Sequence, residues 1–336
     1  MAPHTPHLRI DAATTPFDGP RPELSVVIPV YRGADTIGPL VDKLLEHLGD
    51  TYRLEIVLVN DGSPDHSAEV CRRLAHTHAA VRFVNLARNF SEHNAVMAGL
   101  NHAQGDAIVI MDDDFQNPPG EVIKLVAELQ RGYDVVYSYY EKKRHSTWRN
   151  WGSKFNNLVA SVMLDKPRDL YLSSFKALNR FTVEQITKYD GPYPYIDGLI
   201  LQVTRSISRV LVEHDPRQTG KSGYTLRKLI SLWLNMFTNF SVLPLRFASA
   251  VGFVFAFLGL VMGVYCLIER IQDPDQPVGW ASLMVTVLVI GGVQLFALGM
   301  IGEYLGRLFL KQNGRPQFVV RERVDGVKAE TQRKAA

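Results

Sequence analysis

The chain has 336 residues and a formal net charge of +3, which gives no electrostatic support for binding nucleic acid. Its two cysteines, Cys71 and Cys266, exclude a disulfide framework and a cysteine-based metal site, and they indicate a reducing compartment for the soluble part. Residues 1–245 have the composition of a soluble protein, and the apolar excess follows them. One or two domains are expected.

Residues 1–22 contain five prolines and no hydrophobic periodicity, which predicts a flexible leader that lacks the apolar core of a signal peptide. Strands and helices are then predicted to alternate, an order typical of an α/β fold with an open, mostly parallel, Rossmann-like sheet. The predicted strands are 24–30, 55–60, 81–86, 107–111 and 134–138, and the predicted helices are 36–48, 66–79, 92–104 and 120–130.

Polar side chains follow each of the first four predicted strands. They are Tyr31 and Arg32, residues 60–63, Arg88 and Asn89, and residues 112–116. Because open α/β sheets bind ligands at the carboxyl ends of their strands, we expect these groups to converge on one crevice. Neither a G-x-G-x-x-G pattern after the first strand nor a G-x-x-x-x-G-K-[ST] pattern is present, which disfavours a Rossmann dinucleotide site and a P-loop.

Three consecutive carboxylates, Asp112, Asp113 and Asp114, end the fourth predicted strand. Three like charges at a strand end are unfavourable unless a cation lies among them. If the extended backbone continues, Asp112, Asp114 and Gln116 share one face and Asp113 points to the other. Oxygen ligands of this kind suit Mg²⁺ or Mn²⁺ bound together with phosphates. The alternative is a solvated acidic loop.

The carboxyl-terminal third predicts attachment to a membrane. Residues 224–246 predict interfacial helices, with a core helix of the globular domain as the alternative. Residues 247–302 contain two apolar segments long enough to span a bilayer, joined by a short loop at 269–279. Residues 271–279 hold two Asp and no Lys or Arg, whereas Lys and Arg flank the outer ends of the two segments. By the positive-inside rule, the loop is external and both termini are cytoplasmic.

Six motifs occur in order ahead of, and within, these apolar segments, and together they resemble the family 2 glycosyltransferases of GT-A fold. The narrower resemblance is to the polyprenyl-phosphate glycosyltransferases, such as dolichol-phosphate mannose synthase, bactoprenol glucosyltransferases and undecaprenyl-phosphate aminoarabinose transferases. It covers residues 24–320 and implies a cytoplasmic GT-A domain at 23–223 and a cytoplasmic segment at 303–336. The motifs are VIPVY at 27–31, VNDGS at 59–63, RNF at 88–90, MDDDFQNPP at 111–119, R-x-x-G-x-S-x-Y at 217–224 and GEYLGR at 302–307.

The resemblance implies a role for each site residue. Asp112 and Asp114 would be catalytic as metal ligands together with Gln116, and the metal would be Mg²⁺ or Mn²⁺. Asp169 would be the base or the acceptor-side carboxylate. The nucleotide-sugar would be held by Pro29, Tyr31, Asp61, Arg88, Asp112 and Asp113, with Asp61 at the base edge. The acceptor phosphate would be held by Arg217, Lys221, Ser222 and Lys154.

Two positions depart from the family pattern. Relatives place an acidic residue four or five positions before Phe175, where this chain has Tyr171 and Leu170, and Asp169 is the nearest carboxylate. Relatives also often have Lys directly after Ser222, where this chain has Gly223, so that either Lys221 would substitute or the phosphate would rely on Arg217 alone.

The implied reaction is an inverting transfer of one sugar from a nucleotide-sugar, expected to be a UDP-sugar, to undecaprenyl phosphate at the inner membrane. The resemblance further implies a multi-pass protein in contact with the lipid bilayer and a homo-oligomer, expected to be a tetramer. Three alternatives are a processive polysaccharide synthase, a weakly catalytic membrane scaffold that binds nucleotide-sugar, and a nucleotidyltransferase. The Q-x-x-R-W element of processive synthases and the Gly-rich loop of nucleotidyltransferases are not found.

Overall fold

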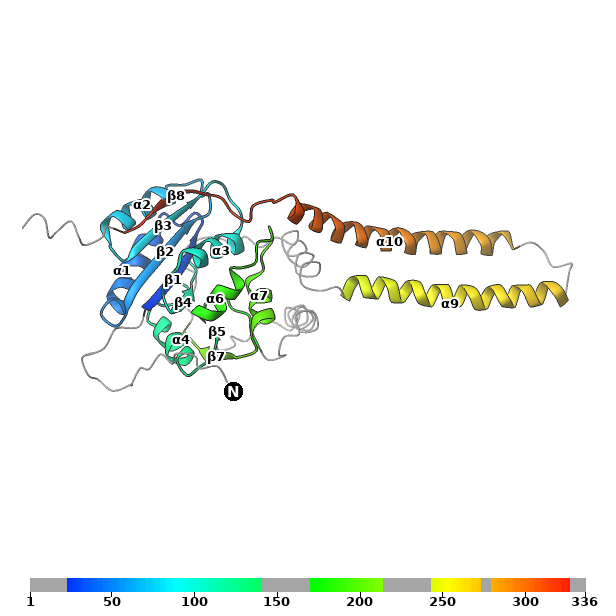
Figure 1. The fold of residues 1–336 in the computed structure, drawn as a ribbon, viewed down its shortest axis with the longest axis horizontal. Helices are drawn as coiled ribbons and strands as arrows, with labels where there is room; N and C mark the ends of the chain where they lie inside the picture. The colour runs from blue at the N-terminus through cyan, green and yellow to red at the C-terminus, as the bar shows by residue number, and fades with distance from the viewer. Residues whose placement is uncertain (1–22, 141–169, 214–242, 273–278, 327–336) are drawn as a thin grey trace, which may run out of the picture. The chain divides into compact units, whose positions relative to one another are not determined.

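The computed structural model describes residues 23–140, 170–213, 243–272 and 279–326 (Figure 1). Contacts between residues divide the chain into two compact units, residues 1–223 with 316–336, and residues 224–315. The first unit holds a sheet with its covering helices, and the second holds two long helices.

In the described residues, the first unit has an eight-stranded sheet in the order β7-β5-β6-β4-β1-β2-β3-β8. The strands are β1 (Glu23–Val30), β2 (Arg53–Asn60), β3 (Val81–Leu86), β4 (Ala107–Ile110), β5 (Val135–Tyr139), β6 (Lys176–Asn179), β7 (Ile207–Leu211) and β8 (Val320–Val324). The helices are α1 (Ile37–Leu48), α2 (Ser67–Thr77), α3 (Glu92–His102), α4 (Glu121–Leu129), α6 (Arg180–Ile186) and α7 (Ile196–Val203).

The mostly parallel sheet predicted from the sequence is confirmed. Strands β4, β1, β2 and β3 are parallel, and Val27 in β1 aligns with Val57 in β2 and Ile110 in β4. Two strands are antiparallel: β6 pairs between β4 and β5, and β8 pairs with β3. The sheet is therefore mixed, with an uninterrupted parallel part at its centre.

Amphipathic helices cover the sheet as their hydrophobic spacing predicts. In α1 the buried side chains recur at helical spacing, at Ile37, Leu40, Val41, Leu44 and Leu48. Each fully buried side chain of this size contributes about 1.5–3 kcal/mol to folding. α1, α2 and α4 share one core cluster with β1 and β2. α3 packs against β1 and β2 as well, and a Cβ at Gly99 would overlap Val27, so this helix lies unusually close to the sheet.

The segment after the second long helix returns to the first unit as β8. Arg72 on α2 forms a bidentate ion pair with Glu322, at 2.8 and 2.6 Å. The Ala87 N–H donates to the Val319 carbonyl at 2.8 Å, and the Gln317 amide donates to the Gly191 carbonyl at 2.9 Å. Residues 317–324 are thus held to α2, to the end of β3 and to the 189–191 loop.

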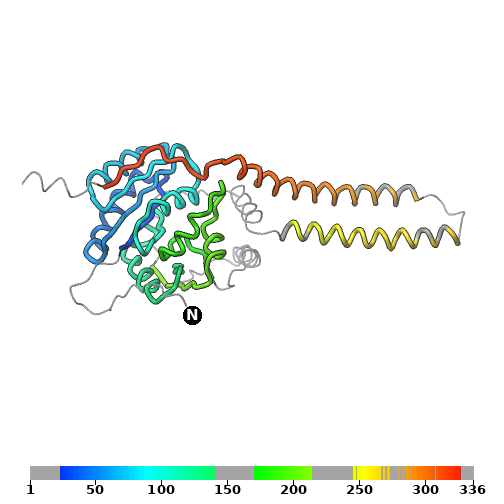
Figure 2. The backbone as a smooth tube through the Cα atoms, viewed as in Figure 1, coloured from blue at the N-terminus to red at the C-terminus, as the bar shows by residue number. Residues whose placement is uncertain are grey.

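In its described part, the second unit has the helices α9 (Leu243–Gln272) and α10 (Trp280–Gln312), which lie side by side (Figures 1 and 2). Segments Ala248–Tyr265 and Val285–Gln312 are long and apolar enough to cross a membrane. Phe253 is 78% exposed and Leu295 is 72% exposed, so the described protein leaves these side chains uncovered. The two predicted apolar helices are present, and α10 continues past Gly302 to Gln312.

Candidate active site

The loops that follow β1 and β4 meet at the point where the strand order of the sheet reverses. β1 has β2 on one side and β4 on the other, which is the arrangement that opens a crevice at the carboxyl ends of strands. A Cβ at Gly33 would overlap the Asp113 carboxylate, and the Tyr31 backbone hydrogen-bonds to that carboxylate. The predicted convergence of these two polar strand ends is therefore confirmed.

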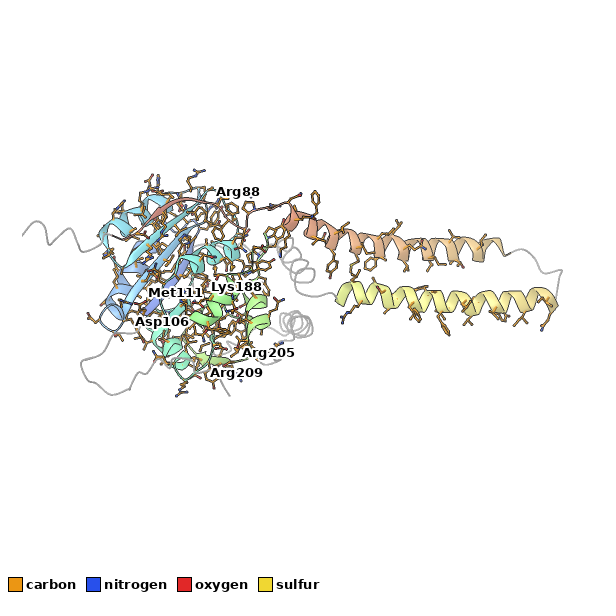
Figure 3. All side chains as sticks on the ribbon, in the orientation of Figure 1. Arg88, Asp106, Met111, Lys188, Arg205 and Arg209 are labelled. Atoms are coloured by element: carbon orange, nitrogen blue, oxygen red, sulfur yellow. The ribbon has the colours of Figure 1, made fainter. Side chains whose placement is uncertain are left out.

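The acidic loop does not continue the strand. β4 ends at Ile110, and Phe115 has a φ of 60°, so the side-chain alternation expected of an extended backbone does not apply to residues 112–116. The Asp114 carboxylate turns back on its own loop and accepts a hydrogen bond from the Gln116 N–H at 3.1 Å. Asp106 lies directly before β4 and Met111 directly after it, and both are labelled in Figure 3.

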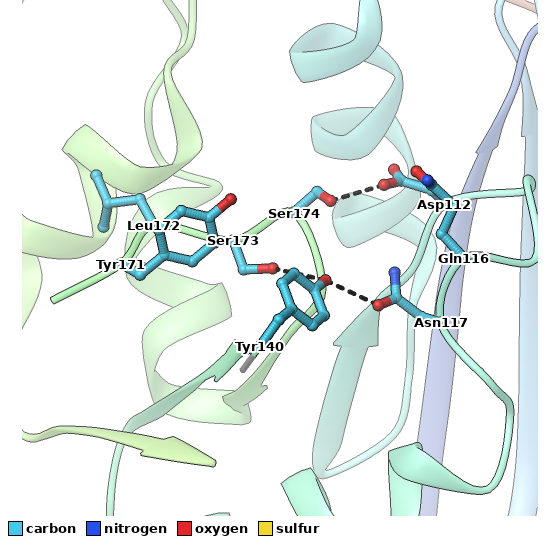
Figure 4. A pocket seen from close by; sticks show the side chains of 8 residues that line it. All are labelled: Asp112, Gln116, Asn117, Tyr140, Tyr171, Leu172, Ser173 and Ser174. Atoms are coloured by element: carbon cyan, nitrogen blue, oxygen red, sulfur yellow. Dashed lines mark hydrogen bonds between the residues drawn. The ribbon is translucent and has the colours of Figure 1, made fainter. Parts of the chain in front are cut away.

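A cavity of about 270 Å³ lies beside the acidic loop (Figure 4). The Ser174 hydroxyl donates to Asp112 Oδ2 at 2.6 Å, and the Tyr140 hydroxyl donates to Asn117 Oδ1 at 2.8 Å. These hydrogen bonds fix two wall residues of the cavity. The lining residues are Asp112, Gln116, Asn117, Tyr140, Tyr171, Leu172, Ser173 and Ser174.

Negative charge is concentrated at the acidic loop. Burial, and then repulsion by Asp112 and Asp114, raise the pKa of Asp113 to about 7. Loss of hydration, and then the charge of Asp112, raise the pKa of Glu92 to about 7 as well. Asp113 Oδ2 is buried and has no hydrogen-bond partner in the described structure. A divalent cation among these carboxylates would lower their mutual repulsion, so the residues present fit such an ion.

The structure places the predicted metal ligands unevenly around the cavity. Asp112 and Gln116 line it, whereas Asp114 is buried in the loop and is not among the lining residues. Within the described ranges, no three His, Cys, Asp or Glu side chains are grouped closely enough to hold a metal ion by themselves. A cation held here would take oxygen ligands from a bound diphosphate in addition, as Mg²⁺ usually does.

The predicted nucleotide-binding residues lie at the carboxyl ends of β1, β2, β3 and, for Asp112 and Asp113, β4. Asp61 is buried and accepts hydrogen bonds from the Phe90 and Ser91 N–H groups at 2.7 and 3.0 Å. Burial raises the pKa of Asp61, and these two hydrogen bonds oppose that effect. Each carboxylate oxygen retains a second acceptor site, so Asp61 can still accept from a base edge.

The remaining nucleotide-binding candidates are accessible. Tyr31 is 47% exposed, and Pro29 is partly buried. The Arg88 guanidinium is exposed and lies 4.5 Å from the centre of the Phe90 ring (Figure 3). The predicted acceptor residues Lys154, Arg217, Lys221 and Ser222, and Asp169, lie outside the described residues.

Sequence reasoning missed a buried polar cluster behind the acidic loop. The Lys176 ammonium on β6 donates to Asp197 Oδ1 on α7, and the Tyr137 hydroxyl donates to the same oxygen at 2.8 Å. His93 on α3 packs edge-on against Tyr195, with ring centres 5.3 Å apart. The only sequence signal was Lys176 in the S-S-F-K motif, because the four-residue strand β6 has no periodicity of its own.

Substituting Gly62 tests whether the turn after Asp61 depends on the close approach of its backbone to that of Arg88 and Asn89. Gly62 has a φ of 59°, and a Cβ there would overlap the backbone of Arg88 and Asn89. We expect Gly62→Ala to lower the free energy of unfolding by about 1–3 kcal/mol. Gly132→Ala is the matched control, because Gly132 also has a positive φ but has open space around it. Equal losses of thermal stability in the two variants would contradict the close-approach argument.

The titration of His93 gives a second test. Burial lowers the pKa of His93 to about 4, although Asp197 acts in the opposite direction. An unfolded histidine titrates near pH 6.5, so below that pH the unfolded state binds a proton that the folded state does not. Stability should therefore fall as the pH drops from 6.5 towards 4, by up to about 1.4 kcal/mol per pH unit from this residue. Between pH 7 and pH 5 the melting temperature should decline less steeply in His93→Gln than in the wild type. An equally steep decline in both proteins would contradict the lowered pKa of His93.

Comparison with known proteins places this geometry in a family. Residues 25–188 match the model of glycosyl transferase family 2, and residues 243–308 match that of the GtrB C-terminal hairpin. An undecaprenyl-phosphate 4-deoxy-4-formamido-L-arabinose transferase of Pseudomonas savastanoi pv. phaseolicola is 34% identical, over 88% of this chain and 89% of that protein. An uncharacterized glycosyltransferase of Synechocystis is 33% identical, over 89% of this chain and 94% of that protein.

Among solved structures, glucosyl-3-phosphoglycerate synthase of Mycobacterium tuberculosis matches with a TM-score of 0.48 and 19% identity. The match covers 64% of this chain and 80% of that one. The chain combines a crevice at the strand-order reversal, a carboxylate loop beside it and an apolar hairpin. It is also similar to the named transferase of Pseudomonas savastanoi over most of its length. The protein is a member of glycosyltransferase family 2.

Proposed function

We propose that this protein transfers one sugar, with inversion, from a UDP-sugar to undecaprenyl phosphate at the cytoplasmic face of the inner membrane. The observation that carries the proposal is the carboxylate-rich crevice between β1 and β4 in a chain that also has two exposed apolar helices. Similarity to enzymes named as undecaprenyl-phosphate transferases supports the acceptor. The product would be a lipid-linked monosaccharide.

Asp112, Asp114 and Gln116 would hold Mg²⁺ or Mn²⁺, which when bound supplies positive charge against the leaving diphosphate. Ser174 holds the Asp112 carboxylate through its 2.6 Å hydrogen bond, which limits the orientations that this ligand can take. Asp113 lies on the side of the Tyr31–Gly33 loop and would contact the nucleotide rather than the cation. Asp61, Pro29, Tyr31 and Arg88 would hold the nucleoside diphosphate.

In the proposed reaction, an oxygen of the acceptor phosphate attacks the anomeric carbon while the bond from that carbon to the UDP oxygen breaks. The configuration at the carbon inverts, and UDP leaves with the electron pair. A phosphate monoester is already mostly deprotonated near neutral pH, so the enzyme gains more from placing the nucleophile than from removing a proton. Arg217, Lys221, Ser222 and Lys154 are the proposed phosphate ligands, and Asp169 is the proposed acceptor-side carboxylate.

We propose that α9 and α10 cross the membrane with both outer ends in the cytoplasm. Arg246 directly precedes the first apolar segment, and Lys311 and Arg315 follow the second, whereas residues 271–279 hold no Lys or Arg. Single cysteines placed at position 276 and at position 330 should react differently with an impermeant maleimide in intact cells. Labelling at 276 alone is the expected result, and labelling at 330 alone would reverse the orientation.

The reaction can be tested with full-length protein in detergent, undecaprenyl phosphate and a panel of radiolabelled UDP- and GDP-sugars. Each donor would be assayed with Mg²⁺, Mn²⁺ or EDTA, and the label that partitions into butanol would be counted. We expect lipid-phase label from a UDP-sugar with either cation and none with EDTA. Long polymeric product would indicate a processive synthase, and UDP binding without transfer from any donor would indicate a scaffold.

A further inference from the structure

Phe115 in the acidic loop has a backbone conformation that its own side chain disfavours. Its φ of 60° lies in the left-handed region, which a bulky residue seldom adopts because its Cβ crowds the following carbonyl oxygen. Such a conformation persists only where the surrounding contacts impose it. Phe115 stands between Asp114 and Gln116, so the contacts that hold its backbone also set the directions of two proposed metal ligands.

Two contacts hold the Phe115 ring against α1. The ring is partly buried and packs against the hydrophobic core that α1 shares with β1 and β2. The Lys43 ammonium on α1 lies 5.1 Å from the centre of the ring, within the range of a cation–π interaction. The ring therefore has an apolar anchor and, in addition, a cation that favours its position.

The turn at Phe115 decides where the neighbouring side chains point. Asp114, directly before it, is buried and accepts a hydrogen bond from the Gln116 N–H at 3.1 Å. This hydrogen bond spans Phe115, so the backbone of Phe115 and the directions of its two neighbours change together. Gln116 and Asp112 line the cavity beside the loop. An extended backbone at Phe115 would point the same side chains in other directions.

Resting on the function proposed above, we propose that Phe115 is a positioning residue for the cation site. Its ring, held against α1 by the core and by Lys43, keeps the acidic loop in the turn that directs the proposed metal ligands. Phe115 acts in this role through the backbone of the residues beside it, without touching the cation. Residues that orient metal ligands commonly account for about 10–100-fold in metal affinity.

The test measures Mn²⁺ binding to full-length protein in detergent with saturating UDP. Electron paramagnetic resonance of free Mn²⁺ gives the Kd, with Mn²⁺ and UDP without protein as the blank. Phe115→Gly removes the ring but introduces a residue that adopts a positive φ readily, so it tests the anchor without added backbone strain. We expect the Kd of Mn²⁺ to rise by about tenfold or more. Each variant is measured well below its melting temperature, so that a loss of stability alone leaves the Kd unchanged.

Phe115→Leu and Lys43→Met test the contact between the ring and the ammonium. Leucine keeps an apolar anchor without the aromatic ring, and methionine keeps most of the Lys43 stem without its charge. Each should raise the Kd of Mn²⁺ by about two- to fivefold, and the double variant should bind no more weakly than Phe115→Leu, because both changes remove one contact. Lys188→Met is the control, since exposed Lys188 donates to the Gln185 side chain at 2.8 Å, and it should keep the wild-type Kd.

A wild-type Kd in Phe115→Gly would overturn the proposal, and so would additive losses in the double variant. If the wild type transfers sugar while Phe115→Gly keeps its Mn²⁺ affinity, the positioning role fails and the proposed reaction stands. If the variants lose affinity as expected but no donor gives lipid-phase label in the wild type, the positioning role stands and the proposed reaction fails. A wild type that binds no Mn²⁺ with UDP would overturn the positioning role together with the metal assignment.

Discussion

Asp112→Asn is expected to reduce sugar transfer by at least about 100-fold, because one charged oxygen ligand is lost beside the leaving diphosphate. Asparagine has nearly the same shape and can still accept the hydrogen bond that Ser174 donates to Asp112 at 2.6 Å. The loss should therefore come from charge and not from misfolding. Initial rates of label transfer at saturating Mn²⁺, with melting temperature recorded for each variant, measure it.

Asp106→Asn is the matched control for this substitution. Asp106 lies directly before β4 and is exposed, and its backbone bonds to Glu23 in β1 and to Arg180 at the start of α6. It should retain wild-type transfer. Asp114→Ala is expected to abolish transfer as well, through loss of the second carboxylate. A near wild-type rate in Asp112→Asn or Asp114→Ala would show that the metal assignment is wrong.

Lys176→Met is expected to cost about 3–5 kcal/mol of folding stability, which is the range measured when one partner of a buried ion pair is removed. The Lys176 and Asp197 side chains are only 4% and 10% exposed. Methionine fills a similar volume but leaves the Asp197 carboxylate buried without its cation, with the hydrogen bond from the Tyr137 hydroxyl still in place. For a unit of this size, the expected fall in melting temperature is on the order of 10 °C.

The double variant Lys176→Met with Asp197→Asn separates charge from packing. Asparagine still accepts the hydrogen bond from Tyr137 and carries no charge, so most of the lost stability should return. Asp197→Asn alone should also destabilise, because it leaves the Lys176 ammonium buried without its carboxylate. If the double variant lost the sum of the two single effects, the pair would not be coupled and the assignment of a buried ion pair would fail.

The sequence predicted the centre of the sheet because β1 to β4 carry a strong local signal. Runs such as Leu24 to Val30 are apolar on both faces, and α1 shows its buried face at helical spacing. Polar residues at the strand ends then located the crevice. The same reasoning did not locate β6, which has four residues, or β8, whose three consecutive charged residues show no apolar alternation. These strands are defined by their partners across the sheet, and not by their own composition.

The candidate site was predicted less completely than the fold. Residue types alone identified Asp112, Asp113 and Asp114 as site candidates. The directions of their side chains could not be predicted, because they depend on where β4 ends and on the positive φ of Phe115. Asn117 lies in the MDDDFQNPP motif, but its pairing with Tyr140 depends on a hydrogen bond between positions 23 residues apart. Lys176 and Asp197 likewise depend on the packing of β6 against α7, which no local pattern encodes.

β8 is the last strand of the sheet to be synthesised. One edge of β3 therefore stays unpaired until both apolar helices have left the ribosome. At usual translation rates the delay is on the order of ten seconds or more. During that interval the edge of β3 offers unpaired N–H and C=O groups to other nascent chains. The order of synthesis therefore makes completion of the sheet depend on synthesis of both apolar helices, so a chain truncated within α9 or α10 would lack its edge strand β8.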